Sequence, residues 1–252
     1  MDGVLVVLAH QDDEYFALPW IAKEIAAGND IACVFLTDGG TRTDPDTRNK
    51  ESLDALCSVG VRSHRVAFLG TEHSIHDGSL SRNLGVAYEH LETWLEQNSF
   101  RVARVYSPDY EGGHPDHDAA HLIAFRASSR RGVVSDAWSF SLYNCYRSRK
   151  PVFRTLRIIR RPGARFVRYS IVRGFGYAMF CWRYRSQRRT WLGLFPESFL
   201  RRVFLRTEWV NPFDGARLRE RPHDGELLYE WMFGARHFEF SGYAREFLRD
   251  EG

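Results

Sequence analysis

The sequence lacks any long apolar run and is poor in cysteine. No stretch of about 18 uninterrupted apolar residues occurs among its 252 residues, so we expect no membrane-spanning helix. The four cysteines have no CxxC spacing and two lie in apolar-periodic segments, which favours buried free thiols in a reducing compartment. No basic segment precedes the first apolar run, so this run is interpreted as a strand rather than a signal peptide.

A dinucleotide-binding motif and acidic residues are each missing from one part of the sequence. No GxGxxG follows the first apolar run, so a dinucleotide-binding function has little support. Residues 147–190 hold 14 Lys and Arg but no Asp or Glu, which leaves 21 of the 35 basic residues beside all 32 acidic ones elsewhere. Such segregation of charge usually indicates a binding partner.

Strand-like and helix-like patterns alternate over the first 143 residues. This alternation predicts an α/β fold, a Rossmann-like, mostly parallel sheet with helices on both faces. We assign residues 1–146 to a catalytic core and residues 147–252 to a basic-aromatic C-terminal appendage packed on it. Strands are expected at 3–9, 30–38, 64–70, 102–108 and 137–143, and helices at 14–28, 46–59, 82–97 and 116–130.

Two polar clusters follow the first and fourth expected strands. Residues 10–14 read HQDDE, and residues 111–121 read EGGHPDHDAAH. Ligands of open α/β sheets bind outside the carboxyl ends of the strands, and in the usual strand order these two strands are neighbours. The clusters therefore predict one divalent metal site, with zinc as a suitable ion, an open position for water, and three ligands: His10, Asp13 and His117.

Three further residues suit the chemistry around such a metal. Asp12 is free to act as a base on the water, or it caps the helix that follows. His114 can stabilise an oxyanion or protonate a leaving group, or it is an ordinary loop histidine. Asp116 can hold the imidazole of His114 in one tautomer, or it is the N-cap of the next helix.

The two clusters also carry a family resemblance. AHQDDE at 9–14 and GGHPDHDAAH at 112–121 closely resemble the motifs of the PIG-L-like (LmbE-like) metal-dependent N-acetylglucosaminyl de-N-acetylases. Glutamine replaces the usual proline of the first motif, and proline is not a ligand. TDGG at 37–40 and RNKESLDA at 48–55 are similar to the family as well, so the resemblance spans residues 3–143.

The resemblance implies a role for each motif residue. It implies that zinc is bound by His10, Asp13 and His117. Asp12 is implied to be the general base, and this assignment rests mainly on the family. His114, paired with Asp116, is implied to stabilise the oxyanion and to serve as the acid.

Candidate substrate contacts are less tightly defined. The resemblance suggests that Arg48 reaches a polar or anionic part of the substrate, whereas the alternative is a surface arginine paired with Glu51. Asp77 contacts a sugar hydroxyl or is a turn residue before glycine. His223 is a third candidate. Further histidines could add metal ligands, although isolated surface positions fit them better: His73, His76 and His121.

Aromatic side chains interleave with the arginines of residues 147–190. This combination suits an interface with anionic lipid or a nucleic-acid surface. It also suits a substrate lid whose arginines pair with the acidic body. The metal site argues against nucleic acid, whereas a lipid-linked or phosphorylated glycan would explain both features. The aromatic residues are Phe153, Phe166, Tyr169, Phe175, Tyr177, Phe180, Trp182 and Tyr184.

The expected function is the hydrolysis of an acetamide. We expect a hydrolase with one Zn²⁺ per chain that removes the acetyl group of a GlcNAc-type amino sugar in glycoconjugate or polysaccharide biosynthesis. The alternatives are a metal-dependent amidase for a non-sugar conjugate or antibiotic intermediate, and a catalytically inactive glycan- or lipid-binding module. Intact ligands and an intact base argue against the inactive module. The expected location is the cytoplasm, either free or peripheral on the inner face of the membrane.

Overall fold

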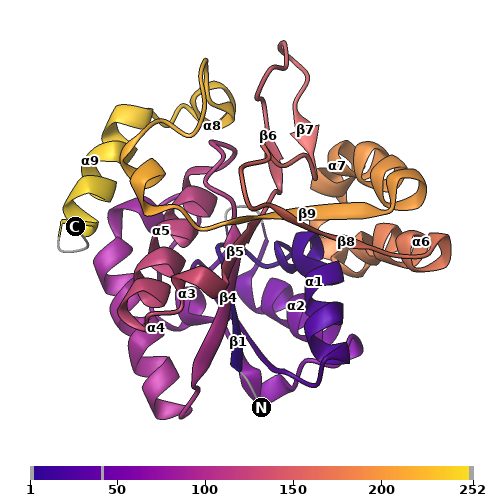
Figure 1. The fold of residues 1–252 in the computed structure, drawn as a ribbon, viewed down its shortest axis with the longest axis horizontal. Helices are drawn as coiled ribbons and strands as arrows, with labels where there is room; N and C mark the ends of the chain where they lie inside the picture. The colour runs from indigo at the N-terminus through magenta and orange to yellow at the C-terminus, as the bar shows by residue number, and fades with distance from the viewer. Residues whose placement is uncertain (1–2, 41–42, 250–252) are drawn as a thin grey trace.

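The computed structural model describes residues 3–40 and 43–249, and a seven-stranded sheet forms the centre of this part of the chain (Figure 1). The strand order is β3-β2-β1-β4-β5-β9-β8. Strands β1 to β5 are parallel, whereas β9 is antiparallel to β5 and β8 is antiparallel to β9. The predicted α/β fold with a mostly parallel sheet is confirmed. The strands are β1 (Gly3–Leu8), β2 (Asp30–Phe35), β3 (Val66–Ala67), β4 (Val102–Pro108), β5 (Ala137–Phe140), β8 (Arg165–Arg168) and β9 (Thr207–Pro212).

The α-helices lie around this sheet. They are α1 (Glu14–Ala26), α2 (Pro45–Ser58), α3 (Leu69–Glu72), α4 (Leu84–Gln97), α5 (Pro115–Arg130), α6 (Ile171–Met179), α7 (Arg188–Leu200), α8 (Leu228–Met232) and α9 (His237–Phe247). A π-helix at Arg201–Leu205 follows α7 directly. Short 3₁₀ turns lie at Ser63–Arg65, Leu80–Arg82, Val134–Asp136, Phe180–Arg183, Arg185–Gln187 and Gly215–Arg219.

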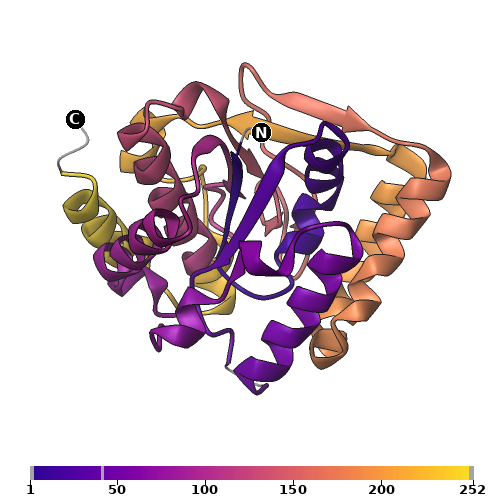
Figure 2. The ribbon, with the colours of Figure 1, turned by 90° about the horizontal axis from the view of Figure 1, so that it is seen from below.

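Alternate residues of β1 show that both faces of the sheet are covered. Val4 and Val6 belong to one apolar cluster with side chains of α1, α2 and α7. Leu5 and Val7 belong to a second cluster with α4, α5 and α9. Successive side chains of a strand point to opposite faces, so a strand buried on both sides reads as a continuous apolar run. Figure 2 shows these two groups of helices on either side of the sheet.

The third predicted strand is shorter than expected. Only Val66 and Ala67 pair with β2, and the chain then turns at Phe68 into the short helix α3. Gly70 explains this turn, because a β-carbon there would lie 2.1 Å from the backbone of Thr37. The close approach ties α3 to the loop after β2 instead of continuing the strand. The fifth predicted strand is also shorter and ends at Phe140.

The C-terminal region contributes to the sheet itself. Strands β8 and β9 lie beyond residue 146 and extend the sheet from β5. A separate hairpin of β6 (Tyr143–Asn144) and β7 (Arg154–Thr155) stands apart from the sheet beside α8 (Figure 1). The division into a core of residues 1–146 and an appendage of residues 147–252 stays a prediction. Among the described helices, none combines the length and hydropathy that a membrane-spanning segment needs.

Candidate metal centre

Two loops meet at the carboxyl ends of β1 and β4, which are neighbours in the sheet. The turn after β1 carries His10 and Asp13, and His117 lies in the first turn of α5, after β4. Asp13 is fixed by its own turn, since its Oδ2 accepts hydrogen bonds from the backbone N–H groups of Ala9 (3.1 Å) and His10 (2.8 Å). The topology therefore brings the three predicted ligands together.

The ligand atoms of these residues form a small triangle. His10 Nδ1 lies 3.2 Å from His117 Nε2, and His117 Nε2 lies 3.1 Å from Asp13 Oδ1. His10 Nδ1 lies 3.7 Å from Asp13 Oδ2. Bonds of about 2.0–2.1 Å in tetrahedral geometry place two ligands about 3.3 Å apart. The triangle fits a divalent metal ion, with two imidazole nitrogens and one carboxylate as donors.

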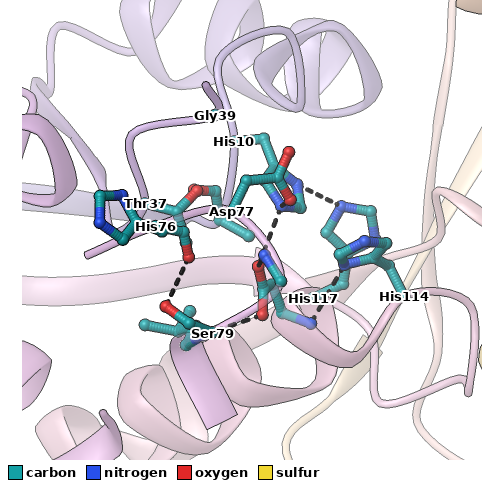
Figure 3. A network of polar contacts seen from close by, with 12 residues as sticks. His10, Thr37, Gly39, His76, Asp77, Ser79, His114 and His117 are labelled. Atoms are coloured by element: carbon teal, nitrogen blue, oxygen red, sulfur yellow. Dashed lines mark hydrogen bonds and ion pairs between the residues drawn. The ribbon is translucent and has the colours of Figure 1, made fainter. Parts of the chain in front are cut away.

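The second nitrogen of His10 faces two carboxylates. Its Nε2 lies 3.1 Å from Asp77 Oδ1 and 3.2 Å from Asp116 Oδ2. A metal-bound histidine is usually oriented in this way, by a carboxylate on the ring nitrogen that does not bind the metal. Figure 3 shows His10, His114 and His117 turned toward one another, with Asp77 beside His10.

The surplus of carboxylates raises the pKa of His10. Burial alone lowers the pKa of this imidazole, but Asp77, Asp116 and Asp13 outweigh burial and raise it well above 6.5. Without a metal, a protonated His10 balances the negative charge of the cluster. A divalent cation would supply that positive charge instead. Its charge would explain how several ionisable groups can lie so close together in one turn.

The structure corrects the predicted partner of Asp116. Its carboxylate lies within 4.8 Å of a ring nitrogen of His114 but makes no hydrogen bond to that ring. It accepts hydrogen bonds from the backbone N–H groups of Gly78 (2.6 Å) and Leu80 (3.1 Å) and faces His10. The reason is its place in the first turn of α5, where the side chain faces the 77–80 loop. Asp116 therefore orients His10, a predicted metal ligand, rather than the imidazole of His114.

His114 is held in one tautomer by the backbone. The N–H of Asp116 donates to His114 Nδ1 (3.2 Å), so that His114 is the N-cap of α5 and its proton resides on Nε2. Burial and the charge of His10 lower the pKa of His114 to about 3. A neutral His114 with a proton on Nε2 is a hydrogen-bond donor in the site. The alternative of Asp116 as the N-cap is wrong.

Asp12 occupies a strained turn. Its φ of +95° lies in the left-handed region that residues with side chains rarely adopt, and such strain concentrates at functional sites. Its N–H donates to Glu14 Oε2 (2.9 Å) and to Ser52 Oγ (3.2 Å). The N-cap of α1 is Asp13 rather than Asp12, so the alternative of a helix-capping Asp12 is wrong.

Arg48 is the partner of the Asp12 side chain. Its Nη2 lies 3.1 Å from Asp12 Oδ1, and its guanidinium also donates to the carbonyl oxygens of Gln11 and Gly39. Burial raises the pKa of Asp12 to about 7, against the lowering effect of Arg48. The alternative of a surface arginine paired with Glu51 is wrong, because Arg48 is 6% exposed and Glu51 accepts from Ser186 instead.

Gln11, at the position of the usual proline, joins the two loops beside Asp12. Its Nε2 donates to Asn49 Oδ1 (2.6 Å) and to the carbonyl of Thr37 (3.3 Å). Gly39 leaves room for it, since a β-carbon there would lie 2.2 Å from Gln11 Oε1, and Gly39 has a φ of +61°. The substitution of proline thus adds hydrogen bonds that hold the loop after β2.

Asp77 is more than a turn residue, because it contacts His10 directly. Its backbone N–H donates to Asp38 Oδ1 (2.9 Å), and Asp38 Oδ2 lies 2.6 Å from His76 Nδ1. Burial raises the pKa of Asp38, but hydrogen bonds from the Gly40 N–H and from His76 outweigh it and lower the pKa. Sequence reasoning missed Asp38, although it lies in the TDGG segment that opens on the same edge of the sheet.

The remaining histidines do not join a metal cluster in the described part of the chain. His121 is buried and its Nδ1 donates to the carbonyl of Pro108 (2.8 Å). His73 stacks on His90, and His76 is bonded to Asp38. His223 is buried beside Tyr146, and its Nδ1 donates to the carbonyl of Asp224 (2.7 Å).

Two buried carboxylates that sequence reasoning missed hold the loop before α5. Asp118 Oδ1 accepts from the N–H groups of Glu111 (3.1 Å) and Gly112 (3.2 Å). The carboxylate of Glu111 accepts from Ser141 Oγ (2.6 Å) and the Leu142 N–H (2.7 Å). These bonds set the path of the backbone into His114. Both residues belong to the second polar cluster, residues 111–121, yet only the tertiary contacts show their partners.

The comparisons with known proteins agree with this geometry. Residues 5–128 match the family model described as PIG-L: GlcNAc-PI de-N-acetylase. Residues 5–128 therefore belong to the PIG-L family. This match confirms the family that the motifs predicted, and it contains every predicted metal ligand.

Curated relatives of this PIG-L-family chain are deacetylases by name. The 1D-myo-inositol 2-acetamido-2-deoxy-alpha-D-glucopyranoside deacetylase 2 of Catenulispora acidiphila is 28% identical over 163 residues, 54% of this chain and 54% of that protein. The enzyme of the same name without the number, from Streptomyces avermitilis, is 27% identical over 207 residues, 67% of this chain and 70% of that protein. The chain therefore spans about half the length of the first of these relatives.

Solved structures share the fold. The conserved protein TT1542 from Thermus thermophilus superposes with a TM-score of 0.59 at 22% identity, and the match covers 84% of this chain and 94% of that one. The likeness in fold to this structure therefore extends beyond the residues that the family model matches.

Proposed function

We propose that this PIG-L-family chain is a zinc-dependent de-N-acetylase that removes the acetyl group of a GlcNAc-type amino sugar in glycoconjugate or polysaccharide biosynthesis. The observation that carries the proposal is the triangle of His10, Asp13 and His117, with two further ionisable side chains beside it, Asp12 and His114. The names of the curated relatives support an acetylated amino sugar as the substrate class.

The chemistry needs a nucleophile and a stabilised oxyanion. A zinc ion on the three ligands would lower the pKa of a neighbouring water and polarise the acetyl carbonyl. Asp12 accepts a proton from this water as the water oxygen bonds to the carbonyl carbon. A pKa of Asp12 near neutrality, raised by burial to about 7, suits a general base.

His114 completes the proposed mechanism as a hydrogen-bond donor. Its Nε2 proton is directed to the carbonyl oxygen as that oxygen becomes negative. The C–N bond then breaks, and the amine nitrogen takes the proton that Asp12 received. Because burial keeps His114 neutral, we assign the acid role to Asp12 rather than to His114. One water and one acetamide give acetic acid and a free amine, and the acid then passes its proton to the amine to give acetate and an ammonium group.

Arg48 and Asp77 have positioning roles beside their predicted contacts with substrate. Arg48 fixes one oxygen of Asp12 and leaves the other for the proton transfer. Asp77 orients His10, and its side chain remains 19% exposed, so that one carboxylate can face both the ligand and a sugar hydroxyl. Contact of either residue with the substrate stays a prediction, as do a lipid-linked or phosphorylated substrate and a cytoplasmic location.

A panel of substrates tests the proposal. Acetate release is measured from N-acetylglucosamine linked to inositol, to a second sugar, to a phosphate and to a lipid, and from non-sugar acetamides. We expect zinc-dependent release from the sugar conjugates and none after chelation. Release from non-sugar acetamides alone would favour the amidase alternative. No release from any substrate by zinc-loaded protein would favour the inactive binding module.

A further inference from the structure

Helix α6 exposes its apolar side rather than burying it. Ile171, Phe175 and Met179 are spaced four residues apart and lie on one side of the helix, exposed by 54%, 52% and 38%. Val172, next to this row, is 77% exposed. The small residues Gly174 and Ala178 face the protein interior. An amphipathic helix on a globular protein normally turns its apolar side inward, so this orientation indicates that something else covers it.

The exposed apolar side of α6 continues onto the next elements. The rings of Phe175 and Phe199 lie 6.2 Å apart, and a β-carbon on Gly174 would lie 2.1 Å from the carbonyl oxygen of Arg202. The Tyr169 N–H donates to the carbonyl of Arg206 (3.2 Å). These contacts join α6 to the end of α7 and the π-helix. We name the α6 surface by its exposed side chains: Ile171, Val172, Phe175, Met179, Leu200, Phe204 and Leu205.

Exposed arginines occur in the sequence before, within and after helix α6. Residues 165–206 hold ten arginines and one acidic residue, Glu197, which accepts from the backbone N–H of Thr155 (2.7 Å). Apart from Arg165, which is exposed and stacks on Trp138, six of these arginines are exposed and make no ion pair with a carboxylate among the residues that the structure describes. They are Arg168 and Arg173 before and within α6, and Arg183, Arg185, Arg188 and Arg189 after it.

Other cations of the basic segment do pair internally. Arg161 lies 3.2 Å from Asp109, Arg157 lies 3.7 Å from Glu197, and Lys150 lies 2.8 Å from Glu226. The lid alternative thus accounts for three of the seven Lys and Arg side chains of residues 147–164. It does not account for the six exposed arginines around α6, whose charge is uncompensated.

We propose that the α6 surface binds the protein peripherally to a bilayer that contains anionic lipid. Apolar side chains flanked by arginines match the acyl region and the anionic headgroups of such a bilayer. A second copy of the chain fits worse, because a two-fold contact through this surface would bring arginines against arginines. Helices α6 and α7 lie at the outer edge of the molecule in both views, so a flat partner can reach them (Figures 1 and 2).

Vesicle co-sedimentation of the full chain tests this proposal and does not depend on the proposed activity. The probes are vesicles of phosphatidylglycerol and phosphatidylcholine in equal amounts, and vesicles of phosphatidylcholine alone. We expect binding to the mixed vesicles at 0.1 M salt and much weaker binding to the neutral ones. Binding should fall at 1 M salt, where the Debye length is about 3 Å instead of about 10 Å.

Two pairs of substitutions locate the binding surface. Val172→Ser with Phe175→Ser should weaken binding at least tenfold. Arg188→Gln with Arg189→Gln should weaken it about 30-fold at 0.1 M salt, since each cation near an anionic bilayer contributes roughly fivefold. The matched controls are Val86→Ser with Phe238→Ser and Arg219→Gln with Arg236→Gln, all exposed positions outside the surface. The controls should bind as the original chain does.

Three outcomes would overturn the proposal. One is the absence of binding to mixed vesicles at 0.1 M salt, and another is equal weakening by the surface pairs and the control pairs. The third is concentration-dependent self-association that Val172→Ser with Phe175→Ser abolishes, which would make the surface an interface between copies. All variants should release acetate from a short, water-soluble N-acetylated sugar at the original rate, so a failure of activity is distinguishable from a failure of binding.

Discussion

At the scale of single residues, the site depends on two adjacent aspartates that face different partners. Asp12 and Asp13 are neighbours in sequence, yet Asp13 accepts from two backbone N–H groups and faces His117, whereas Asp12 faces Arg48. The positive φ of Asp12 separates the two carboxylates. This separation suits the proposed roles, with Asp13 as a metal ligand and Asp12 as the base.

Substitution of His117 tests the metal ligands. His117→Ala removes one of three donors, so zinc bound to the purified protein should fall from one per chain to a small fraction. His73→Ala, at an exposed histidine outside the cluster, should keep its zinc. Metal analysis by mass spectrometry checks both. Equal zinc content in the two variants would contradict the ligand assignment.

Substitution of Asp12 tests the base. Asp12→Asn keeps the shape of the side chain but cannot accept the proton, so kcat should fall by about 10²–10⁴-fold while zinc stays bound. Asp54→Asn, at an exposed aspartate, is the control. Acetate release and zinc content are measured together. A near-normal kcat in fully zinc-loaded Asp12→Asn would mean that another group is the base.

Substitution of His114 tests the oxyanion donor. His114→Ala should lower kcat by roughly 10²–10³-fold with zinc retained, because one hydrogen-bond donor to the developing charge is lost. His114→Gln keeps an N–H group and should recover part of the rate. If His114→Gln and His114→Ala are equally slow, a role as proton donor would be favoured over a role as hydrogen-bond donor.

At the scale of elements, the short helix α3 packs against the loop after β2 and helps to set its position. Thr37 joins this loop to the metal turn, since its Oγ1 donates to the carbonyl of Ala9 (2.7 Å). Gly70 of α3 packs against the backbone of Thr37 with no room for a side chain. The position of the loop beside the site therefore depends on a glycine in a short helix.

A pair of glycine substitutions tests this contact. Gly70→Ala should lower the free energy of unfolding by about 1–3 kcal/mol, because the added methyl group has no space. Gly85→Ala in α4 meets open space and should raise it by about 0.4–1 kcal/mol, since alanine favours the helix. Urea denaturation measures both. A stabilising Gly70→Ala would show that α3 moves freely relative to Thr37.

At the scale of the whole molecule, burial of neutral groups makes stability depend on pH. Burial lowers the pKa of His121 to about 4, from an ordinary value of 6.5. As the pH falls from 6.5 toward 4, the unfolded chain binds a proton at His121, whereas the folded chain does not. Stability that is present above pH 6.5 is therefore lost toward pH 4, by about 3 kcal/mol for a shift of this size.

Replacement of His121 tests this pH dependence. His121→Asn retains a donor for the carbonyl of Pro108 but does not titrate. We expect it to lose less free energy of unfolding than the original chain between pH 7 and pH 4.5. Denaturation with a chelator at both pH values checks this without a contribution from metal release. Equal losses in the two proteins would mean that His121 is protonated without cost in the fold.

The sequence by itself determined the local pattern of the site and the class of the fold. Alternating apolar runs and helical periodicity predict β1 to β5 and the helices α1, α2, α4 and α5, because strand and helix periods are local properties. They do not predict the short helix α3. His10 and Asp13 share one turn, and the strand order makes His117 their neighbour. These relations need only short spacings and the known topology of open sheets.

Only the tertiary structure decided the partners of the remaining residues. Asp116 faces His10 rather than His114, and Arg48 reaches Asp12, because loops distant in sequence close around them. Strand β9 joins the sheet by pairing with β5, and β8 by pairing with β9, and no local spacing encodes these pairings. The periodicity of a helix shows that one side is apolar, but not which side faces the core. In α6 that choice depends on where Gly174 and Ala178 allow close packing, so the outward apolar side emerges only from the fold.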